Sequence, residues 1–213
     1  MVGPIDAVLA IHKAFRRDME NIDAAALDAA RGKPGLESTV ERFRFFNEAL
    51  VWHAHGEEAA IFPALENVAP LVAEAYEMDH RGLDAAFDAL SNAVSARDAL
   101  GSARATAAFK FHLDLHLAKE DAHLYRIIRE RVSLPDQGHA VGVMASHVPQ
   151  DRFADATNWM FPLLSDQDRE NMTRIWKSIM PEPAFAGAKG LIQNALGKVG
   201  WSELVRRIPE LAA

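Results

Sequence analysis

Two histidine–glutamate pairs have the same spacing in this sequence, His53 with Glu57 and His116 with Glu120. Residues four apart on an α-helix lie on one face in adjacent turns, so each pair would project an imidazole and a carboxylate together. His112 lies one turn before His116 and extends that set. Burying such groups without a partner is costly or changes their protonation state, and a bound cation is the simplest partner.

Two further histidines fall on apolar helix faces. At 100° per residue, His12 and His80 share a stripe with apolar side chains, so both face the core. The stripes contain Ile5, Val8, Phe15 and Met19 around His12, and Tyr76, Leu83 and Phe87 around His80. A lone histidine on such a face is more often a hydrogen-bonded core residue than a ligand. The complete set of histidines and glutamates, arriving from several helices, favours a metal site instead.

The elements that carry these residues are long amphipathic helices. Apolar residues recur at helical spacing in four runs, and nothing in the first 132 residues alternates with the period of a strand. The runs extend from Pro4 to Gly32, from Leu36 to Asn67 with Pro63 expected to kink the last turn, from Pro70 onward, and from Gly101 to about residue 132. Long helices joined by short turns predict an all-α fold, an up-down-up-down four-helix bundle over residues 1–133.

The candidate ligands lie at one level of this bundle. With a rise of about 1.5 Å per residue, His12, His53, Glu57, His80, His116 and Glu120 fall roughly 12–23 Å above the same end. Errors of a few residues in the helix boundaries do not scatter the set to opposite ends. The four helices therefore aim their ligands at one region.

Residues 134–213 are predicted to form a separate C-terminal extension of short helices. Prolines at positions 149, 162, 181, 183 and 209 cut this part of the chain into short apolar stretches. The stretch Leu191–Trp201 could lie on a membrane, but it contains a single lysine and glycines that weaken a helix. We expect the extension to pack on the bundle or on a partner subunit, which would allow a homodimer.

Composition excludes several classes of protein. The 213 residues carry a net charge of −7 and no cysteine. An acidic chain lacks the basic signature of nucleic-acid binding, and a chain without cysteine cannot form disulfides, thiolate iron–sulfur clusters or Cys-based zinc fingers. No segment reaches the roughly 18 apolar residues of a membrane span, and the N-terminus lacks the features of a signal peptide. We therefore expect a cytoplasmic protein with no nucleic-acid partner and no membrane association.

The motifs that carry these residues resemble a known family. They are His12, the segment HAHGEEAAIFP from His53 to Pro63, DHRGL from Asp79 to Leu83, and HLAKEDAHLY from His116 to Tyr125. Over about residues 5–132 this pattern is similar to the hemerythrin-like family, also called the HHE cation-binding domain.

The resemblance implies a metal centre of a particular kind. It implies a non-haem di-iron centre with an oxo- or hydroxo-type bridge, bridging carboxylates from Glu57 and Glu120, and terminal imidazoles from His12, His53, His80 and His116. Donor chemistry alone does not distinguish iron from manganese or zinc, since imidazole and carboxylate ligands suit all three. The expectation of iron therefore rests on the resemblance.

The sequence departs from the pattern of oxygen-carrying members in two places. Asp84 stands where those members have a second histidine on the third helix, and Asp121 could act as a ligand in place of Glu120. His112 could supply the missing imidazole or form a hydrogen bond outside the ligand set. His55 and Glu58 point about 140–160° away from His53 and are expected outside the ligand set.

These departures leave more than one function open. The first hypothesis is a binding protein that binds or senses O₂, NO or iron. The alternative is a di-iron enzyme that consumes peroxide, as catalases and peroxidases do, or that reduces NO. Glu-x-x-His spacing at Glu77 and Glu120 also occurs in ferritin-like di-iron bundles, which need a glutamate from each of the two other helices. Here the first helix offers His12 at the right height, with only Asp6, Asp18 and Glu20 nearby, and the two Glu-x-x-His matches fall on neighbouring helices, so the hemerythrin-like interpretation is preferred.

Overall fold

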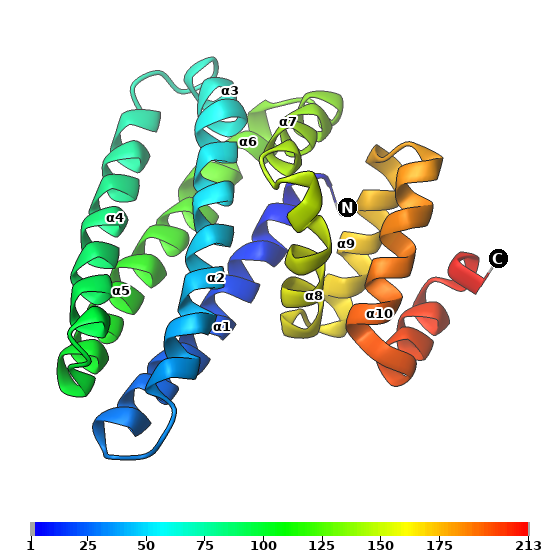
Figure 1. Cartoon of the computed structure of the whole chain (residues 1–213). Helices are drawn as coiled ribbons and strands as arrows, with labels where there is room; N and C mark the ends of the chain where they lie inside the picture. Colours follow the sequence, from blue (N-terminus) through cyan, green and yellow to red (C-terminus); the bar gives the residue numbers. More distant parts are fainter. Residues whose placement is uncertain (1–2, 213) are drawn as a thin grey trace.

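Four antiparallel helical rods make up the first part of the structure, a computed structural model that describes residues 3–212. The rods begin with helices α1 (Ile5–Ala30), α2 (Leu36–Gly56), α4 (Ala73–Ser95) and α5 (Ala99–Lys119). Short turns connect them, and no strand occurs among residues 3–212. The expected all-α four-helix bundle is confirmed (Figure 1).

The second and fourth rods each continue through a π-helical segment. The segment η1 (Glu57–Ile61) joins α2 to α3 (Phe62–Glu66), and η2 (Glu120–Leu124) joins α5 to α6 (Tyr125–Arg131). Pro63 occupies the first turn of α3, just after the π-helical turn, where a missing N–H is tolerated. Single π-helical turns inside α-helices occur frequently at functional sites. Here each one begins at a candidate glutamate ligand.

Two apolar clusters fill the interior on either side of the candidate ligands. One lies toward the loops after α1 and α4 and consists of residues such as Phe15, Phe46, Leu90, Phe109 and Leu113. The other lies toward the opposite end and includes Ile5, Ile61, Tyr76 and Leu124, together with side chains of the extension. On each rod the candidate ligands fall between the residues of the two clusters, so apolar side chains pack on both sides of them along the bundle.

Four helices follow the bundle and pack on one side of it (Figure 1). They are α7 (Leu134–Ser146), α8 (Phe153–Leu163), α9 (Asp166–Ile179) and α10 (Glu182–Arg207), with short 3₁₀ turns at η3 (Gln150–Arg152) and η4 (Pro209–Ala212). Helix α7 contacts α2 and η1, whereas α8 and α9 contact α1 and are covered in turn by α10. Trp159 donates to the buried carboxylate of Asp18 over 2.7 Å, and Lys13 to Asp168 over 2.6 Å. These contacts attach the extension to α1.

Helix α10 is longer than the short helices expected for this segment. Gly197 adopts φ 61°, which breaks the helix into two shorter pieces, while Gly190 and Gly200 lie within helical turns. A positive φ is strained for residues with a Cβ, so glycine suits position 197. None of the helices described over residues 3–212 combines the length and apolar character required to span a bilayer.

Gly56 allows α2 and α7 to approach closely. A Cβ at this position would lie 2.9 Å from the Cα of Met144, a backbone atom that cannot turn away. We expect Gly56→Ala to lower the free energy of unfolding by about 1–3 kcal/mol, because overpacking forces the two helices apart. Gly142→Ala on α7 is the matched control, since a Cβ there meets nothing within 4 Å. Urea denaturation measures both, and equal effects of the two substitutions would contradict this account.

Candidate metal centre

Six of the seven candidate ligands converge inside the bundle. Each rod contributes, and the two glutamates come from the first residues of the π-helical segments. The members are His12 on α1, His53 on α2, Glu57 on η1, His80 on α4, His116 on α5 and Glu120 on η2, and all six are buried. His12, Glu57 and Glu120 have no exposed surface.

The six side chains form two overlapping groups of four. His12 and His53 make one group with both glutamates, and His80 and His116 make the other with the same two glutamates. In each group the donor atoms lie within 4.8 Å of one another. Glu57 Oε1 is 3.3 Å from His53 Nε2, Glu57 Oε2 is 3.5 Å from His80 Nε2, and Glu120 Oε2 is 3.7 Å from His12 Nε2 and 3.4 Å from His116 Nε2. Glu57 and Glu120 therefore lie between two pairs of imidazoles.

Buried polar atoms without a hydrogen-bond partner gather at this place. They include Glu57 Oε2, His80 Nε2 and both carboxylate oxygens of Glu120. An unpaired buried donor or acceptor costs the full desolvation of the group, so such atoms call for a partner. Nitrogen and oxygen donors without thiolate suit iron, manganese or zinc. The residues present therefore fit a divalent or trivalent metal.

The outward ring nitrogens of two histidines are held by carboxylates. Asp121 accepts from His12 Nδ1 over 2.7 Å and is itself paired with Arg16 over 2.7 Å. Glu58 accepts from His80 Nδ1 over 2.8 Å. Each of these carboxylates directly follows a candidate ligand glutamate in the sequence. A carboxylate on the second ring nitrogen fixes the orientation of a metal-binding imidazole and makes it a stronger ligand.

Charges in the metal-free cluster are distributed unevenly between the two glutamates. Burial would raise the pKa of Glu57, but the histidines around it outweigh burial and hold the pKa well below its usual value. Burial raises the pKa of Glu120 well above its usual value, and the charge of Glu57 raises it further. Without metal, Glu57 is therefore a carboxylate at neutral pH, whereas Glu120 keeps its proton to a higher pH than an ordinary glutamate.

The four histidines also differ in the direction in which their pKa values are shifted. Burial would lower the pKa of His12 and of His80, but hydrogen bonds to Asp121, Glu57 and Glu58 outweigh it, so both pKa values are raised above 6.5. Burial lowers the pKa of His53, and it lowers that of His116 to about 4. When no metal is bound, His12 and His80 thus keep a second proton to a higher pH than an ordinary histidine, whereas His53 and His116 lose theirs at a lower pH.

Tyr125 belongs to the site and was not predicted from the sequence. Its side chain is fully buried, and its hydroxyl donates a short hydrogen bond to Glu57 Oε1. Its ring meets that of His12 edge to face at 5.4 Å, while Phe62 stacks on His80 at 5.4 Å. Phe62 and Tyr125 each come five residues after their glutamate, so a signal for this position exists in the sequence. The hydroxyl makes the two halves of the site different.

Replacing Tyr125 by phenylalanine should destabilise the metal-free protein. The substitution removes a buried hydrogen bond to the ionised Glu57, which is worth about 1.5–3 kcal/mol. Tyr76 is the other tyrosine of the chain, and its hydroxyl is hydrogen-bonded to His123 Nδ1 over 3.0 Å, outside the cluster. Tyr76→Phe is therefore a matched control. We expect Tyr76→Phe to cost less than about 1 kcal/mol in urea denaturation. Equal losses of unfolding free energy in the two variants would contradict the larger contribution expected for the hydrogen bond to Glu57.

The structure does not bring His112 into the cluster, which corrects the expectation for that residue. His112 is exposed, and its ring contacts Phe111 on the surface. The buried stripe of α5 runs through Phe109, Leu113 and His116, and position 112 falls on its flank. Asp121 contacts the candidate ligand His12 and is not a member of either group of donors.

Other polar residues near the motifs also lie outside the cluster. His55 and Asp84 are exposed but line a small cavity that reaches His53, His80 and His116. Among residues 3–212, His12, His53, His80 and His116 are the histidines that join the two groups of donors. The cluster therefore contains four imidazoles and two carboxylates.

Comparison with known proteins agrees with this geometry. Three proteins of Arabidopsis thaliana are similar: the zinc finger protein BRUTUS is 27% identical over 187 residues, and two BRUTUS-like zinc finger proteins are 23% and 22% identical over 191 and 193 residues. Each match covers 84% of this chain but 15% of the relative, so the chain spans a small part of their length. No solved structure matches significantly.

A family model for the hemerythrin HHE cation-binding domain matches residues 3–128. This range contains the first three rods, the fourth rod as far as Ile128, and all six residues of the buried cluster. The similarity to the plant proteins covers more of the chain than this range, so it must extend into the helices after residue 128. From the family match, together with the bundle and its cluster, we conclude that the chain belongs to the hemerythrin HHE cation-binding family.

Proposed function

We propose that this chain holds a pair of iron ions and that O₂ or NO binds at that centre, so that the protein carries or senses the diatomic molecule. His12 and His53 would hold one ion, His80 and His116 the other, and Glu57 and Glu120 would contact both. Two irons held there would supply redox-active positions with room for an exchangeable small ligand.

One observation carries the proposal, namely that both groups of donors share the same two glutamates. A shared carboxylate holds two cations at a fixed separation and offsets their repulsion. The carboxylates of Asp121 and Glu58 orient the outer rings, and the apolar clusters on either side exclude bulk water. These residues would keep the nitrogen-rich ligand set in one geometry.

The description of the plant relatives as zinc finger proteins does not extend to this cluster. The chain has no cysteine, whereas zinc fingers bind their ion through cysteine thiolates with or without histidine. The relatives are also far longer than this chain. We propose that the part similar to this chain provides a separate metal-binding function in them.

A polar cavity favours a second function, the consumption of peroxide. A cavity of about 60 Å³ between α2, α4 and α5 touches His53, His80 and His116 and has Asn47, Glu58 and Asp84 in its wall. Such a wall would accept a hydrogen-bonding molecule such as hydrogen peroxide. In this function the polar side chains would orient peroxide beside the three imidazoles.

Metal content and optical spectra test the proposal. Protein from an iron-replete culture should contain about two irons per chain by mass spectrometry, because two groups of donors are present. A stable spectral change on adding O₂ or NO would support binding, and rapid loss of added peroxide without a stable adduct would support the enzyme. No bound iron after anaerobic reconstitution with ferrous iron would overturn both functions.

A further inference from the structure

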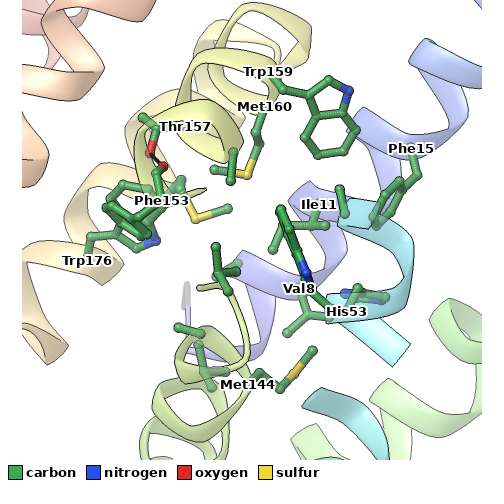
Figure 2. Close-up of a pocket in the computed structure, with 18 residues that line it drawn as sticks. Val8, Ile11, Phe15, His53, Met144, Phe153, Thr157, Trp159, Met160 and Trp176 are labelled. Atoms are coloured by element: carbon green, nitrogen blue, oxygen red, sulfur yellow. Dashed lines mark hydrogen bonds between the residues drawn. The ribbon is translucent and has the colours of Figure 1, made fainter. Parts of the chain in front are cut away.

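An apolar cavity of about 110 Å³ lies where the extension packs on the bundle. One wall comes from α1 and α2, and the other from α7, α8 and α9. Figure 2 shows Val8, Ile11 and Phe15 on one side, with Phe153, Met160 and Trp176 across the cavity from them. Three of the four tryptophans and three of the seven methionines of the chain line it. Flat aromatic and adaptable thioether side chains are typical of pockets that bind apolar molecules.

Two polar groups in the wall are already hydrogen-bonded. The indole N–H of Trp159 donates to Asp18 over 2.7 Å, and the hydroxyl of Thr157 donates to the carbonyl of Phe153 over 2.8 Å. His53 is the one titratable residue in the lining. A cavity lined almost entirely by apolar groups does not hold water firmly. An ionic or strongly polar occupant would lose its hydration without compensation.

His53 connects this cavity to the metal cluster. Its ring lines the cavity and packs edge to face against Phe15 at 5.3 Å, while its Nε2 lies 3.0 Å from His12 Nε2 within the cluster. An occupant of the cavity would therefore contact a residue of the candidate metal centre. Helices α7, α8 and α9 close the other side, so the site exists only when the extension is packed on the bundle.

We propose that this cavity is a binding site for a small uncharged apolar molecule, no larger than a single six-membered ring. A dry engineered cavity of about 150 Å³ lined by apolar side chains binds benzene or xenon, and the present volume is of that order. An empty cavity also lowers stability, and an occupant would restore the lost contacts. The site does not depend on which metal the cluster holds.

Benzene binding to the full chain, as purified with its metal, tests this inference. Because Trp52, Trp159 and Trp176 line the cavity, benzene should change the tryptophan emission in a saturable way. At ten times its dissociation constant it should also raise the melting temperature by about 3–6 °C. Benzoate has the same ring with a charge and should produce neither effect. A linear benzene response, or equal responses to benzene and benzoate, would overturn the proposal.

Filling the cavity provides the matched control. Ala156→Leu on α8 places a larger side chain in the lining and should weaken benzene binding at least tenfold, whereas Ala154→Leu on the same helix lies outside the lining and should leave it unchanged. Ala145→Leu on α7 fills the cavity from an exposed position, which keeps the test valid if the first variant does not fold. Unchanged binding in a folded cavity-filling variant would place the benzene elsewhere.

Discussion

Replacing Glu57 by glutamine should remove metal from both positions of the centre at once. Glu57 belongs to both groups of donors, so its loss takes an anionic ligand from each. Even partners outside the ligand set change metal affinity by about 10–100-fold, so losing a shared ligand should weaken binding by more than about a hundredfold. Metal content per chain after dialysis should fall from about two to near zero.

Two substitutions make this result specific. Glu58→Gln changes the neighbouring residue, whose side chain accepts from His80 Nδ1 outside the cluster, and an amide oxygen can still accept that bond. We expect it to retain the metal. His116→Ala affects one group alone and should leave about one metal per chain, because His12, His53 and both glutamates remain. Equal loss in the Glu57 and Glu58 variants would contradict the assignment of the shared glutamate.

Much of this cluster could be predicted because helical spacing fixes which residues share a face. The two His-x-x-x-Glu pairs needed no knowledge of packing, since adjacent turns of one helix bring them together. The apolar stripes around His12 and His80 placed these residues in the core, and both are buried. The rise per residue then placed the candidate ligands of all four helices at one level of the bundle.

Other features of the site depend on how the helices pack, which the spacing of residues in the sequence does not predict. His112 is one turn from His116, yet the buried stripe of α5 passes through Leu113 and leaves it exposed. The hydrogen bond from Tyr125 to Glu57 depends on a π-helical turn, which shifts the following residues around the rod by one position. The cavity beside His53 could not be predicted either. Its outer wall comes from α7, α8 and α9, and the spacing of apolar residues in the sequence does not tell where these helices pack on α1 and α2.

Acidification should weaken metal binding steeply, because metal must displace protons from the cluster. The pKa values of His12, His80 and Glu120 are raised, so these groups keep protons to higher pH in the metal-free state, whereas ligands must be deprotonated to bind metal. Each displaced proton weakens binding by about tenfold per pH unit below its pKa. Since the pKa values of both histidines lie above 6.5, the competition begins above that pH and grows as the pH falls. The slope should reach about two to three decades per pH unit.

Substitution of the outer carboxylates tests the origin of this slope. Zn²⁺ titrations between pH 6 and 8.5, with proton release measured by calorimetry in two buffers, give the number of protons displaced. Asp121→Asn removes the strongest contact that raises the pKa of His12, so it should reduce that number by about one. Glu58→Gln should change it little, because Glu57 raises the pKa of His80 more than Glu58 does. A pH-independent affinity in the unmodified protein would contradict the charge distribution, and equal effects of the two substitutions would contradict the role of Asp121.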